Sequence, residues 1–206
     1  MAKNRVLFSL AFLIFFASVT YAQDYPVGIS FVRPNQEVIV TDLHLEAASS
    51  ASSAPLVASA IETVLRSPRV CCGKDSALGE TPLTDERVSL QDLGNKLSGR
   101  HILSDGRPVT ITADYFAAST INSSQIVLPL LRQQPMLMQW NSHLYVLYGV
   151  TYDEDVYTDG TRDYVIHKLL LLDPGASGST HHAVFDRLKD DWSKVQGLLL
   201  LTATPQ

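Results

Sequence analysis

Apolar residues recur at helical spacing in the first half of the chain. Residues 56–65 carry apolar side chains at positions i, i+1, i+4, i+5, i+8 and i+9, which places them on one face of a helix. Ser52 or Ser53 is a suitable N-cap, with Pro55 in the first turn, where a missing N–H costs little. Ser67 precedes a proline, which predicts the end of this helix.

Three further helices are predicted from shorter patterns. Residues 88–97 form a helix with Ser89 as its cap. A short helix is expected over residues 123–133, capped by a serine at 123 or 124, although Pro129 lies awkwardly inside it. Residues 185–193 suggest a last helix before the final strand.

Strand patterns are denser in the second half of the chain. Apolar and β-forming residues mark five segments, at residues 36–45, 136–140, 143–151, 164–172 and 197–202. Asn141 and Ser142 fit a tight hairpin, whereas residues 153–162 are polar, contain a glycine and predict a longer hairpin loop. Three consecutive antiparallel strands are therefore expected between residues 136 and 172.

The element order predicts an α+β fold with N-terminal helices packed on a C-terminal antiparallel sheet. The chain has 206 residues, of which 46% are hydrophobic and 18% charged. A chain of this length and composition forms one globular domain without needing a disulfide or a metal. We therefore expect a single domain over residues 23–206.

Residues 1–22 have the layout of a cleaved secretory signal peptide. Lys3 and Arg5 precede an uncharged stretch over residues 6–19, and Thr20 and Ala22 stand at the −3 and −1 positions of a cleavage site. As a helix the apolar stretch reaches about 21 Å, short of the roughly 30 Å hydrocarbon core of a bilayer. An uncleaved membrane anchor is the alternative. The protein is expected to be secreted or periplasmic.

The charge balance excludes some partners. The formal net charge is −5, and removing two basic residues with the signal makes it about −7. This acidity argues against a general nucleic-acid binder or a basic membrane-surface protein. No phosphate-binding or dinucleotide-binding glycine motif is present. We expect no cofactor and no metal, and a peptide or protein as partner; the oligomeric state is left open.

The only two cysteines, Cys71 and Cys72, are adjacent. Neighbouring Cα atoms lie about 3.8 Å apart, too close for an unstrained disulfide. The thiols are therefore free, bridge two chains, or take part in chemistry. Lys74 follows them closely, and a thiol at a helix N-terminus near a lysine has its thiolate favoured. One buried structural cysteine and one incidental cysteine is the plainer interpretation.

His143 and Asp173 form the second candidate pair. His143 begins one predicted strand, on the same side as Tyr145 and Leu147, and Asp173 follows the end of the next. In antiparallel neighbours these two positions meet at the same edge of the sheet. A carboxylate there orients an imidazole and stabilises its charged form. A hydrogen-bonded structural histidine and a turn-forming aspartate are the alternatives.

The order of motifs resembles the C-terminal half of the C39-like peptidases, within the papain-like fold. The run Gln134–Val150 (QPMLMQWNSHLYVLYGV) is followed by the pair Asp173-Pro174, by Phe185 and Trp192, and by a glycine with four leucines at residues 197–201. The resemblance covers about residues 125–204. It implies that His143 matches the catalytic base and that Asp173 matches the residue that orients it.

The N-terminal half departs from that family. There a Cys-Gly-Pro-type motif caps a long helix, with a glutamine shortly before it; here Ser53 stands in that place, the nearest upstream glutamine is Gln36, and the cysteines come after the helix. Either Cys71 or Cys72 opens the nucleophile helix, or the scaffold has lost its nucleophile. The functions expected are a thiol peptidase or related acyl-transfer enzyme, an inactive papain-like binding module, or a redox-sensing structural protein.

Other polar and aromatic clusters carry weaker indications. His181 and His182 with Asp186 are a possible metal site, although adjacent histidines do not share a helix face. The acidic residues between 153 and 159 lack the spacing of a calcium loop, which indicates a solvated hairpin tip. Trp140 and the tyrosines at 145, 148 and 152 either line a ligand groove or pack within the sheet.

Overall fold

A computed structural model describes residues 28–41, 43, 56–65, 89–102, 106–176 and 182–206. The predicted signal segment, the proposed helix caps at 52 and 53, and both cysteines lie outside these residues. The described strands are β1 Ile29–Ile39, β2 Gly99–Ile102, β3 Pro108–Ala117, β4 Met136–Trp140, β5 His143–Tyr157, β6 Arg162–Leu172, β7 His182–Asp186 and β8 Val195–Pro205. The described helices are α1 Leu56–Leu65, α2 Leu90–Leu97 and α3 Ser123–Leu131, with one 3-10 turn at Trp192–Lys194.

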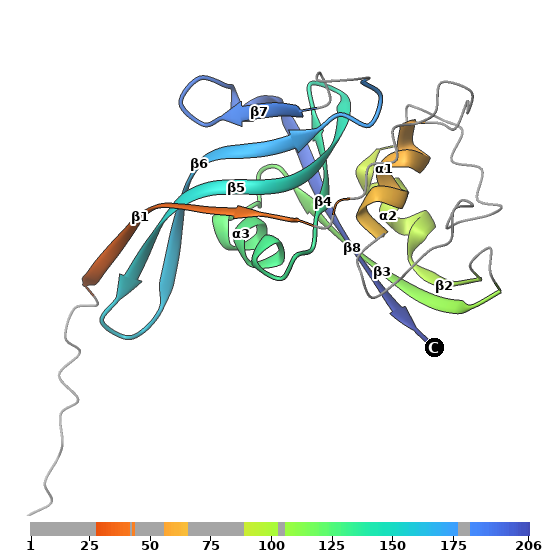
Figure 1. Ribbon diagram of the computed structural model, residues 1–206. Helices are drawn as coiled ribbons and strands as arrows, with labels where there is room; N and C mark the ends of the chain where they lie inside the picture. Colours follow the sequence, from red (N-terminus) through yellow and green to blue (C-terminus); the bar gives the residue numbers. More distant parts are fainter. Residues whose placement is uncertain (1–27, 42, 44–55, 66–88, 103–105, 177–181) are drawn as a thin grey trace, which may run out of the picture.

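The described strands form a single antiparallel sheet in an α+β fold. Their order across the sheet is β2-β3-β8-β4-β5-β6-β7, and β1 pairs with the far half of β5 (Figure 1). The expected meander β4-β5-β6 is confirmed. The expectation of N-terminal helices is wrong in order: β1 is the first described element, and α3 stands between β3 and β4. No helix in the described part of the chain is long and apolar enough to cross a bilayer.

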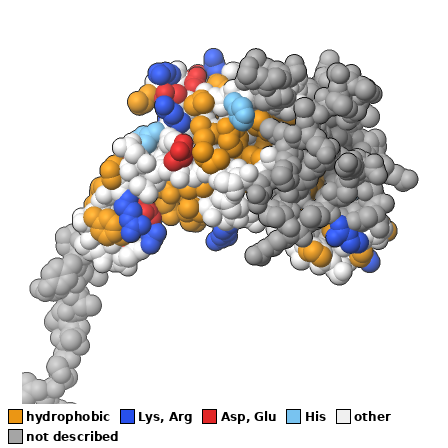
Figure 2. Space-filling view, viewed as in Figure 1, with side chains coloured by type: hydrophobic (Ala, Val, Ile, Leu, Met, Phe, Trp, Pro, Cys, Tyr) orange, Lys and Arg blue, Asp and Glu red, His pale blue; other side chains and the backbone are white. Residues whose placement is uncertain are grey.

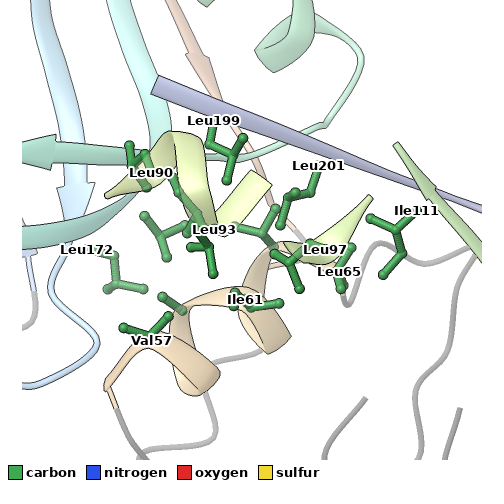
Figure 3. Packing of buried hydrophobic residues seen from close by; sticks show 14 of the residues in the cluster. Val57, Ile61, Leu65, Leu90, Leu93, Leu97, Ile111, Leu172, Leu199 and Leu201 are labelled. Atoms are coloured by element: carbon green, nitrogen blue, oxygen red, sulfur yellow. The ribbon is translucent and has the colours of Figure 1, made fainter. Parts of the chain in front are cut away.

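Helices cover both faces of the sheet. On one face α1 and α2 pack against leucines and isoleucines of β3, β6 and β8 (Figure 3). The predicted apolar face of α1 is the buried one, and Ser89 caps α2 by accepting from the amide of Asp92. On the other face α3 packs against alternate residues of β4, β5 and β8. The alternation along each strand therefore separates two apolar layers.

The cap of α3 lies one residue earlier than the sequence suggested. The side chain of Asn122 accepts from the amide of Gln125 at 2.9 Å, and the side chain of Gln125 accepts from the amide of Asn122. This reciprocal pair satisfies two amides at the helix start. Pro129 lies within the last turns, and the helix ends two residues later at Leu131.

The polar segment at residues 153–162 is mostly strand, which corrects the expected long loop. β5 continues to Tyr157 and β6 begins at Arg162, and β1 pairs with β5 up to Tyr157, with a register shift opposite Asp153. Glu154, near the start of this segment, is 5% exposed and contacts Arg33 at 3.2 Å and Arg162 at 2.7 Å. Figure 2 shows basic and hydrophobic side chains side by side at this end of the molecule.

The predicted helix at residues 185–193 is absent. Phe185 is fully buried within β7, whereas Leu188 is 92% exposed in the turn that follows. Aspartate side chains hold the turn: Asp186 accepts from the amide of Leu188 at 3.0 Å, and Asp190 accepts from the amide of Asp186 at 2.7 Å. Such side-chain bonds to nearby amides compete directly with helix formation.

Candidate functional site

The β4–β5 hairpin places His143 at the rim of the sheet. Its two turn residues, Asn141 and Ser142, have φ values of 52° and 62°, as a two-residue turn that matches strand twist requires. Ser142 donates its amide to the side chain of Gln196 at 3.0 Å, which ties the turn to β8. His143 is therefore the first residue of a strand that pairs with β4 on one side and with β6 on the other.

Asp173 reaches the same rim from β6. Val146 and Leu172 are paired across β5 and β6, so the residue after Leu172 lies close to the beginning of β5. The carboxylate of Asp173 accepts from the amide of Gly175 at 2.8 Å, which fixes it in the turn that follows the strand. This turn is the one that the Asp-Pro pair predicted.

The two side chains meet, as predicted. Nε2 of His143 lies 3.0 Å from Oδ1 of Asp173, and their side chains are 40% and 22% exposed. Nε2 is shielded from water, and the carboxylate oxygen lies off the line of an N–H bond, so the contact is electrostatic rather than a well-aligned hydrogen bond. No hydrogen bond to Nδ1 is found among the described residues, so the ring's contacts with them are those with Asp173 and Tyr145.

Aromatic side chains wall this pair on one side. The ring of Tyr145 lies 4.7 Å from the ring of His143 and 5.8 Å from that of Trp140. Burial, with the nearby charge of Asp173 as a smaller cause, raises the pKa of Tyr145 above its ordinary value. The aromatic residues that were expected either to pack in the sheet or to line a groove thus pack in the sheet. Tyr145 and Trp140 also border the His143–Asp173 pair.

The pair lies at the rim on the α3 side of the sheet. Tyr145 and Leu147, which share the side of His143, belong to the α3 layer, whereas Leu144 and Val146 belong to the layer under α1 and α2. The beginning of α1 therefore belongs to the opposite face. Cys71 and Cys72 lie in the sequence between α1 and α2, outside the described residues.

A second histidine–aspartate pair was missed by sequence reasoning. Nε2 of His167 lies 3.0 Å from Oδ1 of Asp153, and the same oxygen accepts from the amide of Asn35 at 2.7 Å. That amide, and then His167, lower the pKa of Asp153. Asp153 lies on β5 and His167 on the adjacent β6. Because residue 153 was expected in a loop and residue 167 in a strand, the sequence pattern gave no sign that the two side chains meet.

The weaker candidates are placed in ordinary structural roles. The hydroxyl of Tyr148 lies 3.0 Å from Nδ1 of His182, and Asp186 binds the turn after β7 and Lys189 at 3.4 Å. No group of three metal-ligating side chains occurs among the described residues, a part of the chain that does not include His181.

Comparisons with known proteins give no relative for this chain. No protein-family model, no curated protein and no solved structure matches it.

Proposed function

We propose that this chain is an exported papain-like thiol peptidase or a related acyl-transfer enzyme. In it a thiolate of Cys72 or Cys71 attacks a peptide carbonyl, His143 transfers the proton and Asp173 orients the imidazole. The observation that carries the proposal is the 3.0 Å approach of Asp173 Oδ1 to His143 Nε2 at the sheet rim. The resemblance of residues 125–204 to C39-like peptidases supports the same assignment.

The geometry gives each ring nitrogen a separate task. Asp173 faces Nε2 and leaves Nδ1 for the nucleophile. Tyr145 packs against the ring and limits its rotation. Because α1 packs on the opposite face, the mechanism requires the thiol to approach around the rim near the β4–β5 hairpin.

The first test measures thiol reactivity in the full chain. Iodoacetamide labelling followed by peptide mass analysis gives a rate for each cysteine, and the urea-unfolded chain gives the reference rate. We expect one cysteine to react well above its unfolded rate, because a neighbouring imidazole favours the thiolate. His143→Ala should remove this acceleration. His167→Ala is the matched control, since His167 has the same 3.0 Å contact with an aspartate elsewhere, and it should leave the rate unchanged.

Turnover is tested next on a peptide library. Cys72→Ala, Cys71→Ala and His143→Ala are compared with the unaltered chain, and loss of the base should lower cleavage by about 10²- to 10⁴-fold. Folded-state rates equal to the unfolded reference, with no effect of His143→Ala, contradict the enzyme proposal. A dimer that dissociates on reduction indicates instead the redox-sensing alternative.

A second candidate is an inactive papain-like module that binds a peptide without cleaving it. It is favoured by Ser53, which stands where the related family has its thiol, because a hydroxyl is a far weaker nucleophile than a thiolate. Two slow thiols together with saturable peptide binding at the His143 rim would support this module over the enzyme.

A further inference from the structure

A pocket of about 340 Å³ lies beside α3, and neither His143 nor Asp173 is among its lining residues. Its walls come from the start of α3, from residues 163–166 of β6, and from Arg187 and Trp192. It borders the first half of β6, because β7 pairs only with residues 168–172 of that strand. Its volume is at the lower end for small-molecule sites, which suits a ligand of one or two amino acids.

Arg187 brings a positive charge that has no anionic partner among the described residues. Its guanidinium stacks on the ring of Trp192 at 4.5 Å, and no described residue accepts a hydrogen bond from it. Stacking occupies the flat face of a guanidinium and leaves its edge, with parallel N–H donors, for a planar anion. A carboxylate matches that edge with two hydrogen bonds.

Asp163, on the same stretch of β6, is an acidic residue that also lines the pocket. It accepts from the amide of Tyr164 at 2.8 Å, and no basic side chain of the described residues forms an ion pair with it. Its neighbour across the sheet is Asp155, and like charges in directly opposite positions repel each other. A cationic group on a ligand would relieve this repulsion.

The aromatic walls are held in place by their own contacts. Trp192 packs edge-on against Phe185 at 5.5 Å, and Tyr164 packs against Tyr152 at the same separation. Ile126 of α3 adds an apolar side chain to the lining. The pocket thus has a largely polar lining that includes Arg187 and Asp163, together with aromatic groups held by their own contacts, and such fixed groups lower the ordering cost of binding.

We propose that this pocket binds a short zwitterionic peptide. Its carboxylate pairs with Arg187, its ammonium group with Asp163, and an aromatic or large apolar side chain packs on Trp192. The assignment is independent of thiol catalysis, since no residue of the pocket belongs to the His143 site.

The experiment titrates the full chain with the dipeptide Ala-Phe and follows the indole N–H signal of Trp192 by NMR. Two derivatives serve as probes: the C-terminal amide lacks the carboxylate, and the N-acetyl form lacks the ammonium group. We expect saturable binding of the free dipeptide and about tenfold weaker binding of each derivative, as loss of one charged hydrogen bond predicts.

Two variants then assign each charge. Arg187→Gln should bind the free dipeptide and its amide equally well, and Asp163→Asn should bind the free dipeptide and its N-acetyl form equally well. Arg100→Gln, on β2 at the other end of the sheet, should leave all three affinities unchanged. The proposal is overturned if Trp192 shows no saturable shift, if the three peptides bind alike, if the preferences survive in the variants, or if inorganic phosphate displaces the dipeptide and binds as tightly.

Discussion

Single charged side chains in this protein act through the backbone amides and rings that they contact. Asp173 and Asp153 each lie 3.0 Å from a histidine Nε2, and each also accepts a backbone amide. The amide fixes the carboxylate, and the carboxylate in turn limits the orientation of the imidazole. Proximity of histidine to aspartate is therefore not specific to catalysis. The two pairs differ in position, since His143 begins β5 at the rim of the sheet whereas His167 lies within β6.

Asp173→Asn is expected to lower the pKa of Tyr145. Burial raises this pKa most, and the negative charge of Asp173 raises it further, because it disfavours a phenolate nearby. Removing the charge therefore removes only part of the elevation. An NMR titration of the tyrosine ring carbons measures the change. Tyr164 is the control, since its pKa is raised by burial and by Glu154, and an equal fall in both pKa values would contradict a local effect.

Asp153→Asn is expected to reduce stability at neutral pH but not in acid. The pKa of Asp153 lies below its ordinary value of 3.8, first because the amide of Asn35 donates to the carboxylate and then because of His167. A lowered folded pKa stabilises the fold above the unfolded pKa and loses this effect as pH falls through the folded value. Urea unfolding at about pH 7, about pH 4 and about pH 2 should show the two proteins converging. A difference that stays constant with pH would contradict the assignment.

At the scale of elements, the local sequence pattern correctly predicted those features that pairing with distant strands does not change. The face of α1, the cap of α2, the β4–β5 turn and the meeting of His143 with Asp173 all follow from spacing and alternation. The strand β3 was missed although its residues alternate in burial at its start. Its pairing with β8, far along the chain, stabilises it, and such long-range pairing leaves little local signal.

The two segments that were predicted wrongly have a different cause, because in them the local pattern itself pointed to the wrong structure. Residues 185–193 space apolar side chains as a helix does, but aspartates capture the amides that a helix needs. Residues 153–157 are polar as a loop is, yet they remain in strand because β1 pairs beside them and two arginines neutralise Glu154. In both cases a side-chain contact that composition does not reveal decided the backbone conformation.

Gly149→Ala is expected to destabilise the pairing of β1 with β5. An added Cβ would meet the carbonyl oxygen of Val38 at 2.9 Å and Leu170 at 2.8 Å, and crowding of this kind typically costs about 1–3 kcal/mol. Urea unfolding and amide exchange in β1 measure the effect. Gly160→Asn is the control, because space there is open and asparagine tolerates its positive φ. Normal exchange in β1 of Gly149→Ala would contradict the close approach.

At the scale of the whole molecule, the sheet is shared by two apolar layers. Leu137 and Val146 face α1 and α2, while their neighbours Met138 and Leu147 face α3. Neither layer can keep its shape if the strands between them separate. We therefore expect the described elements to unfold together, as the single domain inferred from the sequence requires.

Leu93→Ala tests this coupling from the face that carries neither tryptophan. Leu93 is 2% exposed in the layer of α1 and α2, whereas Trp140 and Trp192 pack in the α3 layer. Truncating a buried leucine costs about 2–5 kcal/mol. If the sheet couples the layers, tryptophan fluorescence and far-ultraviolet dichroism should both report this loss, with one shared urea midpoint. Leu130→Ala, made on the α3 side, should shift the two signals in the same way. An unchanged tryptophan midpoint in Leu93→Ala would mean that the two faces unfold independently, and the rim that aligns His143 with Asp173 would then depend on the α3 layer alone.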